Sequence, residues 1–262
     1  LYFNLNKMNN LFTGSGIKNI SKEKLRNLEI PLPSLEVQQQ IVDELSLLET
    51  SIQTIETRVS QLKMEKEQYK KYGRKAEIRE LLKDSEEVAL GDVCRVNYGK
   101  RITKNKDEGT EYFAYGGGDL MTYKVNQYNR DGITYKISRD GLSRHNCIKK
   151  IYGKIFLNDT ALTLDTLDDK RVNNYYIGEY LLNEKSYIYD NCTHGMAQLH
   201  IDINKLLNFK IPLPSQEVQQ QCIELFEQKE TYIQSIDDKI VQEKKYIEEL
   251  KQLAKDVIST HC

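Results

Sequence analysis

The chain has 262 residues, of which 39% are hydrophobic and 29% are charged, and its formal net charge at pH 7 is −1. It contains no run of about 18 apolar residues, so the sequence predicts no membrane span, and its first residues do not have the layout of a signal peptide. The five cysteines are scattered without a C-x-x-C spacing. That distribution argues against a disulfide framework or a zinc knuckle and predicts a location in the reducing cytoplasm.

An eleven-residue pattern, which we call the Pro/Gln repeat, occurs at residues 30–40 and again at residues 211–221. The first copy reads Ile-Pro-Leu-Pro-Ser-Leu-Glu-Val-Gln-Gln-Gln, and the second differs only by Gln at the sixth position. All four prolines of the chain lie in these two copies. Because an internal repeat determines the architecture, the sequence predicts a repeated unit with a different segment held between its copies.

The similarity between the two copies begins before the prolines. Gly14, Ile20, Lys24, Leu25 and Asn27 recur 181 positions later as Gly195, Ile201, Lys205, Leu206 and Asn208. We therefore interpret residues 1–34 as the closing segment of a truncated first domain, whose second copy closes shortly before residue 215. The rest of that first domain is absent from this sequence.

A long helix is predicted to follow the first copy, from about residue 35 to about residue 83. Its apolar residues alternate in steps of four and three, and Ser34 is a suitable N-cap. Such spacing over four heptads is typical of a coiled-coil seam. Gly73 either interrupts this helix or is tolerated within it. The seam residues are Ile41, Leu45, Leu48, Ile52, Ile55, Val59 and Leu62, and Lys66 interrupts the pattern.

A second long helix is predicted to follow the second copy, in residues 215–262. Its seam has the same steps and is interrupted by Lys229 and Glu243. Because neither helix can bury its apolar stripe alone, we predict that the two pack as an antiparallel coiled coil; the alternative is that each docks on a different partner. The second seam consists of Phe226, Ile233, Ile236, Ile240, Ile247 and Leu250.

The middle block, residues 88–214, has short β-type runs separated by turns and contains 12 of the 17 tyrosines. The Asp-Gly pairs at residues 131–132 and 140–141 are turn signals, and residues 172–184 have helical spacing. The predicted fold class is therefore α+β, with one irregular domain flanked by the two long helices. The predicted strands lie at residues 93–96, 112–115, 133–137, 154–157 and 161–164.

Residues 95–154 hold 13 Lys and Arg residues against 6 Asp and Glu residues, and seven tyrosines are interleaved with them. Cations release counterions from DNA phosphates, while polar and aromatic side chains fix the register or contact base edges. For each single cation the alternative is a solvated surface residue. The candidate DNA-binding residues are Lys100, Arg101, Lys104, Lys106, Tyr115, Gly117, Tyr123, Arg139, Arg144, His145, Lys149, Lys150, His194 and Gln198.

Patterns that would indicate catalysis or phosphate binding are absent from the sequence. The glycines at 116–118 lack both phosphate-loop spacings and instead predict a tight turn. No G-x-S-x-G, H-E-x-x-H or Cys/His nucleophile pattern occurs, and no Pro-Pro is present, which an adenine methyltransferase would need to hold a flipped base. The four histidines lack metal-ligand spacing. We therefore predict a non-catalytic chain without a metal or cofactor of its own.

The order of these parts resembles the specificity subunit of type I restriction–modification enzymes. Its middle block is similar to the family's target recognition domains at Tyr-Gly-Gly-Gly (115–118), Tyr-Lys-Val-Asn (123–126), Ser-Arg-Asp-Gly (138–141), Gly-Lys-Ile-Phe (153–156) and Asn-Asp-Thr-Ala (158–161). The segment Gly-Met-Ala-Gln (195–198) resembles the family's closing Gly-rich loop, which reads Gly-Ser-Gly at 14–16 in the first copy. The resemblance covers nearly the whole chain.

This resemblance implies that residues 88–214 recognise one half of a split DNA site in the major groove. The helices at 35–87 and 215–262 would act as spacers and as the docking surface for DNA adenine methyltransferase subunits, with restriction subunits as a further partner. S-adenosylmethionine, and ATP with Mg²⁺ where DNA is cut, would be bound by those partner subunits.

Two questions stay open on the sequence alone. Because only one recognition domain is present, the chain is either a fragment of a longer subunit or a half-subunit that forms a homodimer. The alternative function is a coiled-coil interaction scaffold without DNA specificity. The dependence of DNA binding on salt separates the scaffold from a DNA-binding protein.

Overall fold

The computed structural model describes residues 12–13, 19–20, 22–27, 32–103, 107–118, 120–196 and 198–261. The chain divides into two compact units. The first consists of Leu1–Lys71 with Tyr232–Cys262, and we call it the helix-pair unit. The second, Tyr72–Thr231, combines helices and sheets, and we call it the mixed unit.

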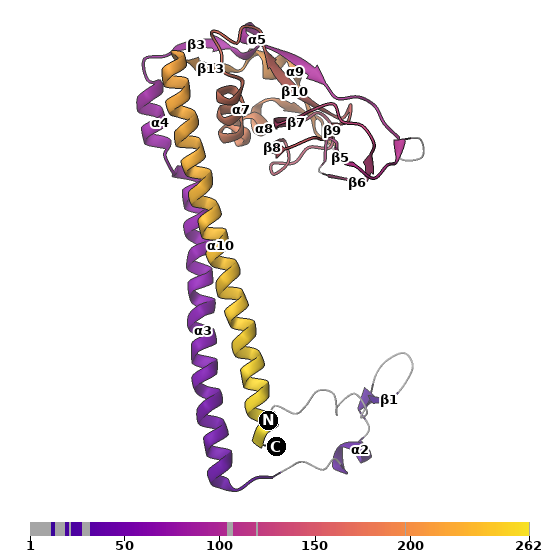
Figure 1. Cartoon of the computed structure of the whole chain (residues 1–262), viewed down its shortest axis with the longest axis vertical. Helices are drawn as coiled ribbons and strands as arrows, with labels where there is room; N and C mark the ends of the chain where they lie inside the picture. The colour runs from indigo at the N-terminus through magenta and orange to yellow at the C-terminus, as the bar shows by residue number, and fades with distance from the viewer. Residues whose placement is uncertain are drawn as a thin grey trace. The chain divides into compact units, whose positions relative to one another are not determined.

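The helix-pair unit is built on two long helices, α3 (Leu35–Tyr72) and the part of α10 (Gln216–His261) that follows Thr231. The two run side by side in opposite directions (Figure 1). Burial of apolar side chains between them removes both stripes from water, which confirms the predicted antiparallel pairing. The buried cluster consists of Ile55, Val59, Ile236, Ile240, Ile247 and Leu250, with Leu48, Ile52 and Leu62 packed against it.

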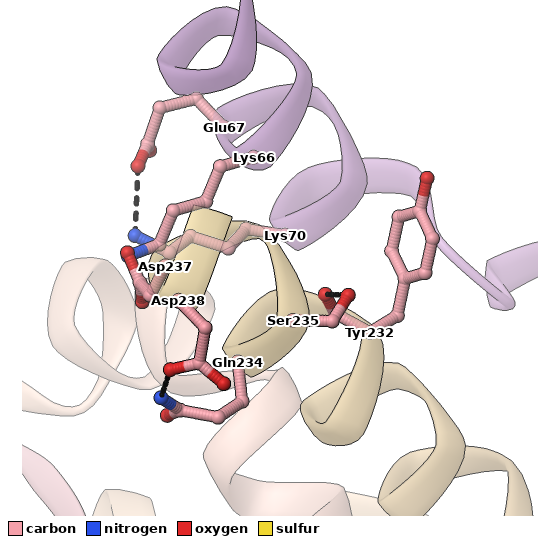
Figure 2. Close-up of polar contacts among 8 residues, drawn as sticks. All are labelled: Lys66, Glu67, Lys70, Tyr232, Gln234, Ser235, Asp237 and Asp238. Carbon is pink, nitrogen blue, oxygen red and sulfur yellow. Dashed lines mark hydrogen bonds and ion pairs between the residues drawn. The ribbon is translucent and has the colours of Figure 1, made fainter. Parts of the chain in front are cut away.

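Two of the polar residues that interrupt the seams, Lys66 and Glu243, form ion pairs across the two helices. Lys66 of α3 lies 2.5 Å from a carboxylate oxygen of Asp237 of α10. Figure 2 draws the two side chains together. Glu243 lies 2.8 Å from a guanidinium nitrogen of Arg58. The residue numbers rise on one helix as they fall on the other, as an antiparallel register requires. Ile41, Leu45 and Ile233 are half-buried.

The first helix is interrupted rather than continuous. α3 ends at Tyr72, and α4 (Lys75–Leu82) begins after Gly73 and Arg74. Arg74 has a φ of 59°, in the left-handed region that a non-glycine residue adopts only at an energetic cost. Phe226, which the spacing assigned to the seam of the helix pair, belongs instead to the core of the mixed unit, together with Ile78 of α4. That assignment is therefore corrected.

The two closing segments have the same local structure. In the first copy β1 (Phe12–Thr13) pairs with β2 (Asn19–Ile20), and α2 (Lys22–Arg26) follows. In the second copy β11 (Thr193–His194) pairs with β12 (His200–Ile201), and α9 (Ile203–Asn208) follows. Both hairpins pair in equivalent registers. The repeat seen in the sequence is therefore also present in the structure of the described residues.

Both copies of the Pro/Gln repeat also start their helices in the same way. The Oγ of Ser34 accepts a hydrogen bond from the amide of Val37 at 3.4 Å, and Ser215 does the same for Val218 at 3.4 Å. The side-chain amides of Gln38 and Gln219 donate to the carbonyls of Pro33 and Pro214 at 2.8 and 2.9 Å. These contacts satisfy backbone groups that a helix N-terminus leaves unpaired.

The mixed unit contains a four-stranded sheet in the order β4-β10-β7-β8, a three-stranded sheet in the order β6-β5-β9, and a two-stranded sheet of β13 and β3. Its core includes Leu162 and Ile137 of the large sheet and Tyr176 of α7. The strands of these three sheets are β3 (Glu86–Ala89), β4 (Cys94–Tyr98), β5 (Tyr112–Tyr115), β6 (Leu120–Val125), β7 (Ile133–Ser138), β8 (Ile148–Tyr152), β9 (Phe156–Leu157), β10 (Ala161–Thr166) and β13 (Lys210–Leu213). The unit also includes the hairpin of β11 and β12, the helices α4, α5 (Leu90–Val93), α7 (Asn174–Asn183), α8 (Lys185–Asn191) and α9, and the part of α10 up to Thr231.

Helix α7 lies unusually close to the large sheet. A Cβ atom on Gly178 would lie 2.1 Å from the ring of Tyr135 of β7, so only glycine fits at this position. The Tyr135 hydroxyl donates a hydrogen bond to the carboxylate of Glu179 at 2.8 Å. The α+β class predicted from the sequence is confirmed, and all five predicted strands and the helix at 172–184 correspond to elements of this unit.

Candidate nucleic-acid interface

Five loops of the mixed unit are joined by backbone contacts into one structure, which we call the loop cluster. Its members are residues 99–101 after β4, 116–118 after β5, 139–141 after β7, 158–160 before β10, and the hairpin 193–201. Thr160 connects three of them, because its carbonyl accepts from the amide of Arg139 at 2.9 Å and its Oγ1 accepts from the amide of Gly117 at 2.8 Å. The loops therefore form one continuous site rather than independent segments.

The hairpin 193–201 and the loop 99–101 are hydrogen-bonded to the loop 139–141 and to the start of β10, respectively. The amide of Ile201 donates to the carbonyl of Arg139 at 2.9 Å, and Asp140 forms a bridge with His200. In the first loop the amide of Gly99 donates to the carbonyl of Ala161 at 3.0 Å. Residues far apart in the sequence are thus held together by hydrogen bonds of the main chain.

A buried lysine holds the loop 116–118 in place by hydrogen bonds to its carbonyl groups. The Nζ of Lys136 donates to the carbonyls of Gly116 and Gly118, at 2.9 and 3.0 Å, and to the Oγ of Ser138 at 3.0 Å. Lys136 is fully buried, so these bonds replace its water shell. A Cβ on Gly117 would lie 1.9 Å from the carbonyl oxygen of Asp140. Gly117 therefore permits the close approach of two loops, which agrees with the tight turn expected from the sequence.

A hydrogen bond between two side chains supports the hairpin in the same way. The Nδ1 of His200 lies 2.7 Å from a carboxylate oxygen of Asp140, and the rings of His194 and His200 have centroids 5.8 Å apart. Sequence reasoning missed Lys136, Asp140 and His200. The Asp-Gly turn signal at 140–141 marked the loop but not the partner of its carboxylate, which lies 60 positions away.

Three of the candidate cations are exposed at the loop cluster: Lys100, Arg101 and Arg139. The guanidinium carbon of Arg139 lies 5.7 Å from the ring centroid of Tyr98, and its Nε lies 3.8 Å from Asp140. An exposed guanidinium over an aromatic ring is oriented while its donors still face solvent. Tyr98 is 47% exposed and was not among the candidates.

Lys150 has a structural role, so its assignment as a DNA contact is corrected. Its Nζ lies 2.7 Å from Glu179 of α7 and 2.8 Å from Glu230 of α10, and its side chain is only 8% exposed. Burial alone would lower the pKa of Lys150, but the hydrogen bonds to the two glutamates outweigh this effect and raise the pKa. An ammonium group held in this way is not free to reach a phosphate.

Arg144 is exposed, but its guanidinium forms a bidentate pair with Asp190 at 2.9 and 2.5 Å and lies 4.9 Å from the ring centroid of Tyr189. The hydrogen bond to Asp190 raises the pKa of Arg144. This pair would have to break before Arg144 could contact a phosphate.

The other candidates occupy different positions. Tyr115, Tyr123 and Lys149 are half-buried, and Tyr123 packs against the small core around Phe156. His145, His194 and Gln198 are exposed, the last two in the hairpin. Lys104 and Lys106 lie outside the described residues.

Within the described ranges, no group of three or more His, Cys, Asp and Glu side chains is arranged to hold a metal ion. Over the same ranges, no helix is both long enough and apolar enough to cross a membrane.

The family model described as the type I restriction modification DNA specificity domain matches residues 1–64 and 82–249. The chain belongs to this family. The similar curated proteins include the type I restriction enzyme MjaVIII specificity subunit of Methanocaldococcus jannaschii, which is 23% identical over 287 residues, covering 94% of this chain and 64% of that protein. The chain thus spans less than two thirds of the length of this relative.

Solved structures of the family show the same fold. The type I restriction–modification S subunit from M. genitalium has a TM-score of 0.50 at 18% identity, covering 96% of this chain and 68% of that one. A chain from a structure concerned with complex assembly and conformational transition of the type I R-M system has a TM-score of 0.56 at 18% identity, covering 95% and 64%. The architecture of long helices with a mixed unit is therefore that of type I specificity subunits.

Proposed function

We propose that this chain is a non-catalytic DNA-sequence-recognition subunit of a type I restriction–modification system. Residues 88–214 would form the target recognition domain and bind one half of a split DNA site. The observation that carries the proposal is the loop cluster, in which five loops are joined by hydrogen bonds and expose Lys100, Arg101 and Arg139. Membership of the family of DNA specificity domains supports it.

The cations and the polar side chains of the loop cluster would contact different parts of the DNA. Lys100, Arg101 and Arg139 would contact phosphates, which supply affinity and orientation but carry no sequence information. Exposed polar side chains of the hairpin, such as His194 and Gln198, would contact base edges in the major groove. Lys136 and the pair of Asp140 and His200 would hold these loops in place before DNA arrives.

The segments outside the recognition domain would position it and recruit partners. Residues 35–87 and 215–262 would act as spacer helices and as the docking surface for DNA adenine methyltransferase subunits, and residues 1–34 would be the closing segment of a truncated first recognition domain. S-adenosylmethionine, and ATP with Mg²⁺ in a restricting complex, would be bound by partner subunits. A half-subunit would form a homodimer that restores two recognition domains. Because its substrate would be DNA, we also propose the cytoplasm as its location.

A selection experiment tests the proposal. The full chain is incubated with DNA duplexes that carry a randomised segment, and the bound fraction is amplified and sequenced over several rounds. We expect one short motif to be enriched by the wild type and the Arg139→Ala variant to bind that motif more weakly. A matched control is Arg79→Ala, which removes an exposed arginine of α4. Enrichment of no motif would contradict the proposal and favour the scaffold alternative, which the family assignment does not support.

A further inference from the structure

The hairpin of β11 and β12 ends in a tip that combines an apolar and an amide side chain. Met196 is 103% exposed, the highest value among the exposed large apolar residues of the described chain. Gln198, two positions further, is also exposed. A fully exposed methionine has no packing role in the free protein. A ligand that covers both Met196 and Gln198 would need an apolar group next to hydrogen-bonding groups.

The frame beneath this tip is fixed. Gly195 has a φ of 111°, and a Cβ at this position would lie 2.2 Å from the carbonyl oxygen of Gln198, so only glycine forms this turn. The side-chain contact of Asp140 with His200 and the hydrogen bond from the amide of Ile201 to the carbonyl of Arg139 hold the base of the hairpin. A two-stranded ribbon that is anchored at its base and exposed at its tip is a shape that the major groove admits.

A comparison of the two copies of the hairpin sequence separates the positions that are the same from those that differ. Gly14 and Ile20 stand where Gly195 and Ile201 stand in the second copy, and both hairpins pair in the same register. In the aligned sequences of the two copies, however, Ser15 corresponds to Met196 and Ile17 corresponds to Gln198. The two copies therefore share this glycine, this isoleucine and the strand register but differ in sequence at the positions of Met196 and Gln198, as expected of positions that determine a sequence preference.

We propose that the hairpin tip recognises an A·T base pair in the major groove, with Gln198 bound to adenine and Met196 against the thymine methyl group. A glutamine amide matches the N6 donor and N7 acceptor of adenine, and apolar side chains contact the C5-methyl group of thymine. These groups lie on the same major-groove edge of one A·T pair, and Met196 and Gln198 are close enough in the chain to reach both. The inference rests on the proposed DNA-binding function and adds the base pair that this hairpin reads.

The test uses the duplex motif obtained by selection with the full chain. Each thymine is replaced in turn by deoxyuridine, which lacks only the methyl group, and each adenine by 7-deazaadenine, which lacks only the N7 acceptor. We expect wild-type affinity, measured by fluorescence anisotropy, to fall about fivefold or more at the thymine and at the adenine of one base pair.

Two variants then assign each loss to a residue. Met196→Ala should bind the thymine and uracil duplexes equally, and Gln198→Ala should bind the adenine and 7-deazaadenine duplexes equally. The matched controls, Met64→Ala and Gln53→Ala, remove exposed residues of α3 and should keep both losses. Circular dichroism checks that each variant is folded.

The outcomes separate this inference from the proposed function. A selected motif without any loss at its thymines or adenines, or losses that persist in Met196→Ala and Gln198→Ala, would overturn the inference and leave DNA-sequence recognition standing. Failure of the wild type to select any motif would overturn both.

Discussion

The ammonium group of Lys66 lies 2.5 Å from both carboxylate oxygens of Asp237, across the seam of α3 and α10 (Figure 2). Arg58 and Glu243 repeat this arrangement, with the cation on α3 and the anion on α10. The two ion pairs therefore favour α3 against α10 in one register, as polar seam residues do in coiled coils.

Reversing one charge of this pair should destabilise the helix pair, and reversing both should restore it. Lys66→Glu places two carboxylates in a half-buried seam, so we expect a loss of about 1 kcal/mol in the free energy of unfolding. Lys66→Glu combined with Asp237→Lys should recover most of that loss. Thermal unfolding followed by circular dichroism measures both. Equal unfolding temperatures of the single and double variants would contradict this role for the pair.

Lys150 and Lys100 should give opposite results when each is replaced by alanine. Lys150→Ala leaves the buried carboxylate of Glu179 without its cation, so we expect a loss of about 3 kcal/mol in stability. Lys100→Ala removes an exposed cation, so stability should be unchanged while DNA affinity falls and the slope of log affinity against log salt decreases by about 1. Denaturant titration and anisotropy measure the two effects. A stable Lys150→Ala variant with normal folding but weak DNA binding would restore Lys150 as a DNA contact.

The neighbouring glycines of the loop cluster should differ in their tolerance of a methyl group. At Gly117 the added Cβ would lie 1.9 Å from the carbonyl oxygen of Asp140, whereas at Gly118 no atom lies within 4 Å. Gly117→Ala should therefore lower both the unfolding temperature and the DNA affinity, and Gly118→Ala should leave the unfolding temperature unchanged. Comparable unfolding temperatures for the two variants would show that the loops are not held as described.

The buried cysteines should resist alkylation in the folded chain. Cys94, Cys147, Cys192 and Cys222 are all buried, and burial raises the pKa of Cys94 to about 12 and that of Cys222 to about 11. Because only the thiolate reacts, iodoacetamide at pH 8 should leave these four unmodified until denaturant is added. Peptide mass spectrometry reads the result at each position. Rapid labelling of Cys222 in the native chain would contradict its place in the core.

Stability should also respond to pH through these thiols. A raised folded-state pKa means that the folded chain holds the proton more tightly than the unfolded chain does. The contribution of Cys222 is therefore complete below the usual thiol pKa of 9.0 and is lost as the pH rises towards about 11. Cys222→Ala should flatten this alkaline loss in a series of denaturant titrations, and an unchanged pH profile would argue against the thiol as its source.

The helices could be predicted from the sequence because their evidence is local. Steps of four and three give the seam directly, and Ser34 and Ser215 mark the helix starts. The interruption at Gly73 stayed open because helices tolerate single glycines, and the deciding feature is the left-handed backbone of Arg74. Phe226 has seam spacing but is buried in the other core. Spacing identifies an apolar face but not which neighbour covers it.

The candidate site was less predictable because its important contacts are distant in the sequence. Lys150 resembled an exposed cation within a charged run, and only Glu179 and Glu230 reveal that it is buried. The same holds for Lys136, whose partners are loop carbonyls, and for Asp140, whose partner is His200. Polar residues become structural when elements far apart in the chain supply their partners. A local sequence pattern does not show which distant residues will become these partners.

The most direct test of DNA-sequence recognition is the salt dependence of binding to the selected duplex and to a scrambled duplex of equal composition. If three phosphates are neutralised by Lys100, Arg101 and Arg139, affinity should fall about 40-fold between 50 and 200 mM salt, and the selected duplex should stay tighter at every concentration. Equal affinities for the two duplexes, or binding that does not change with salt, would contradict the account.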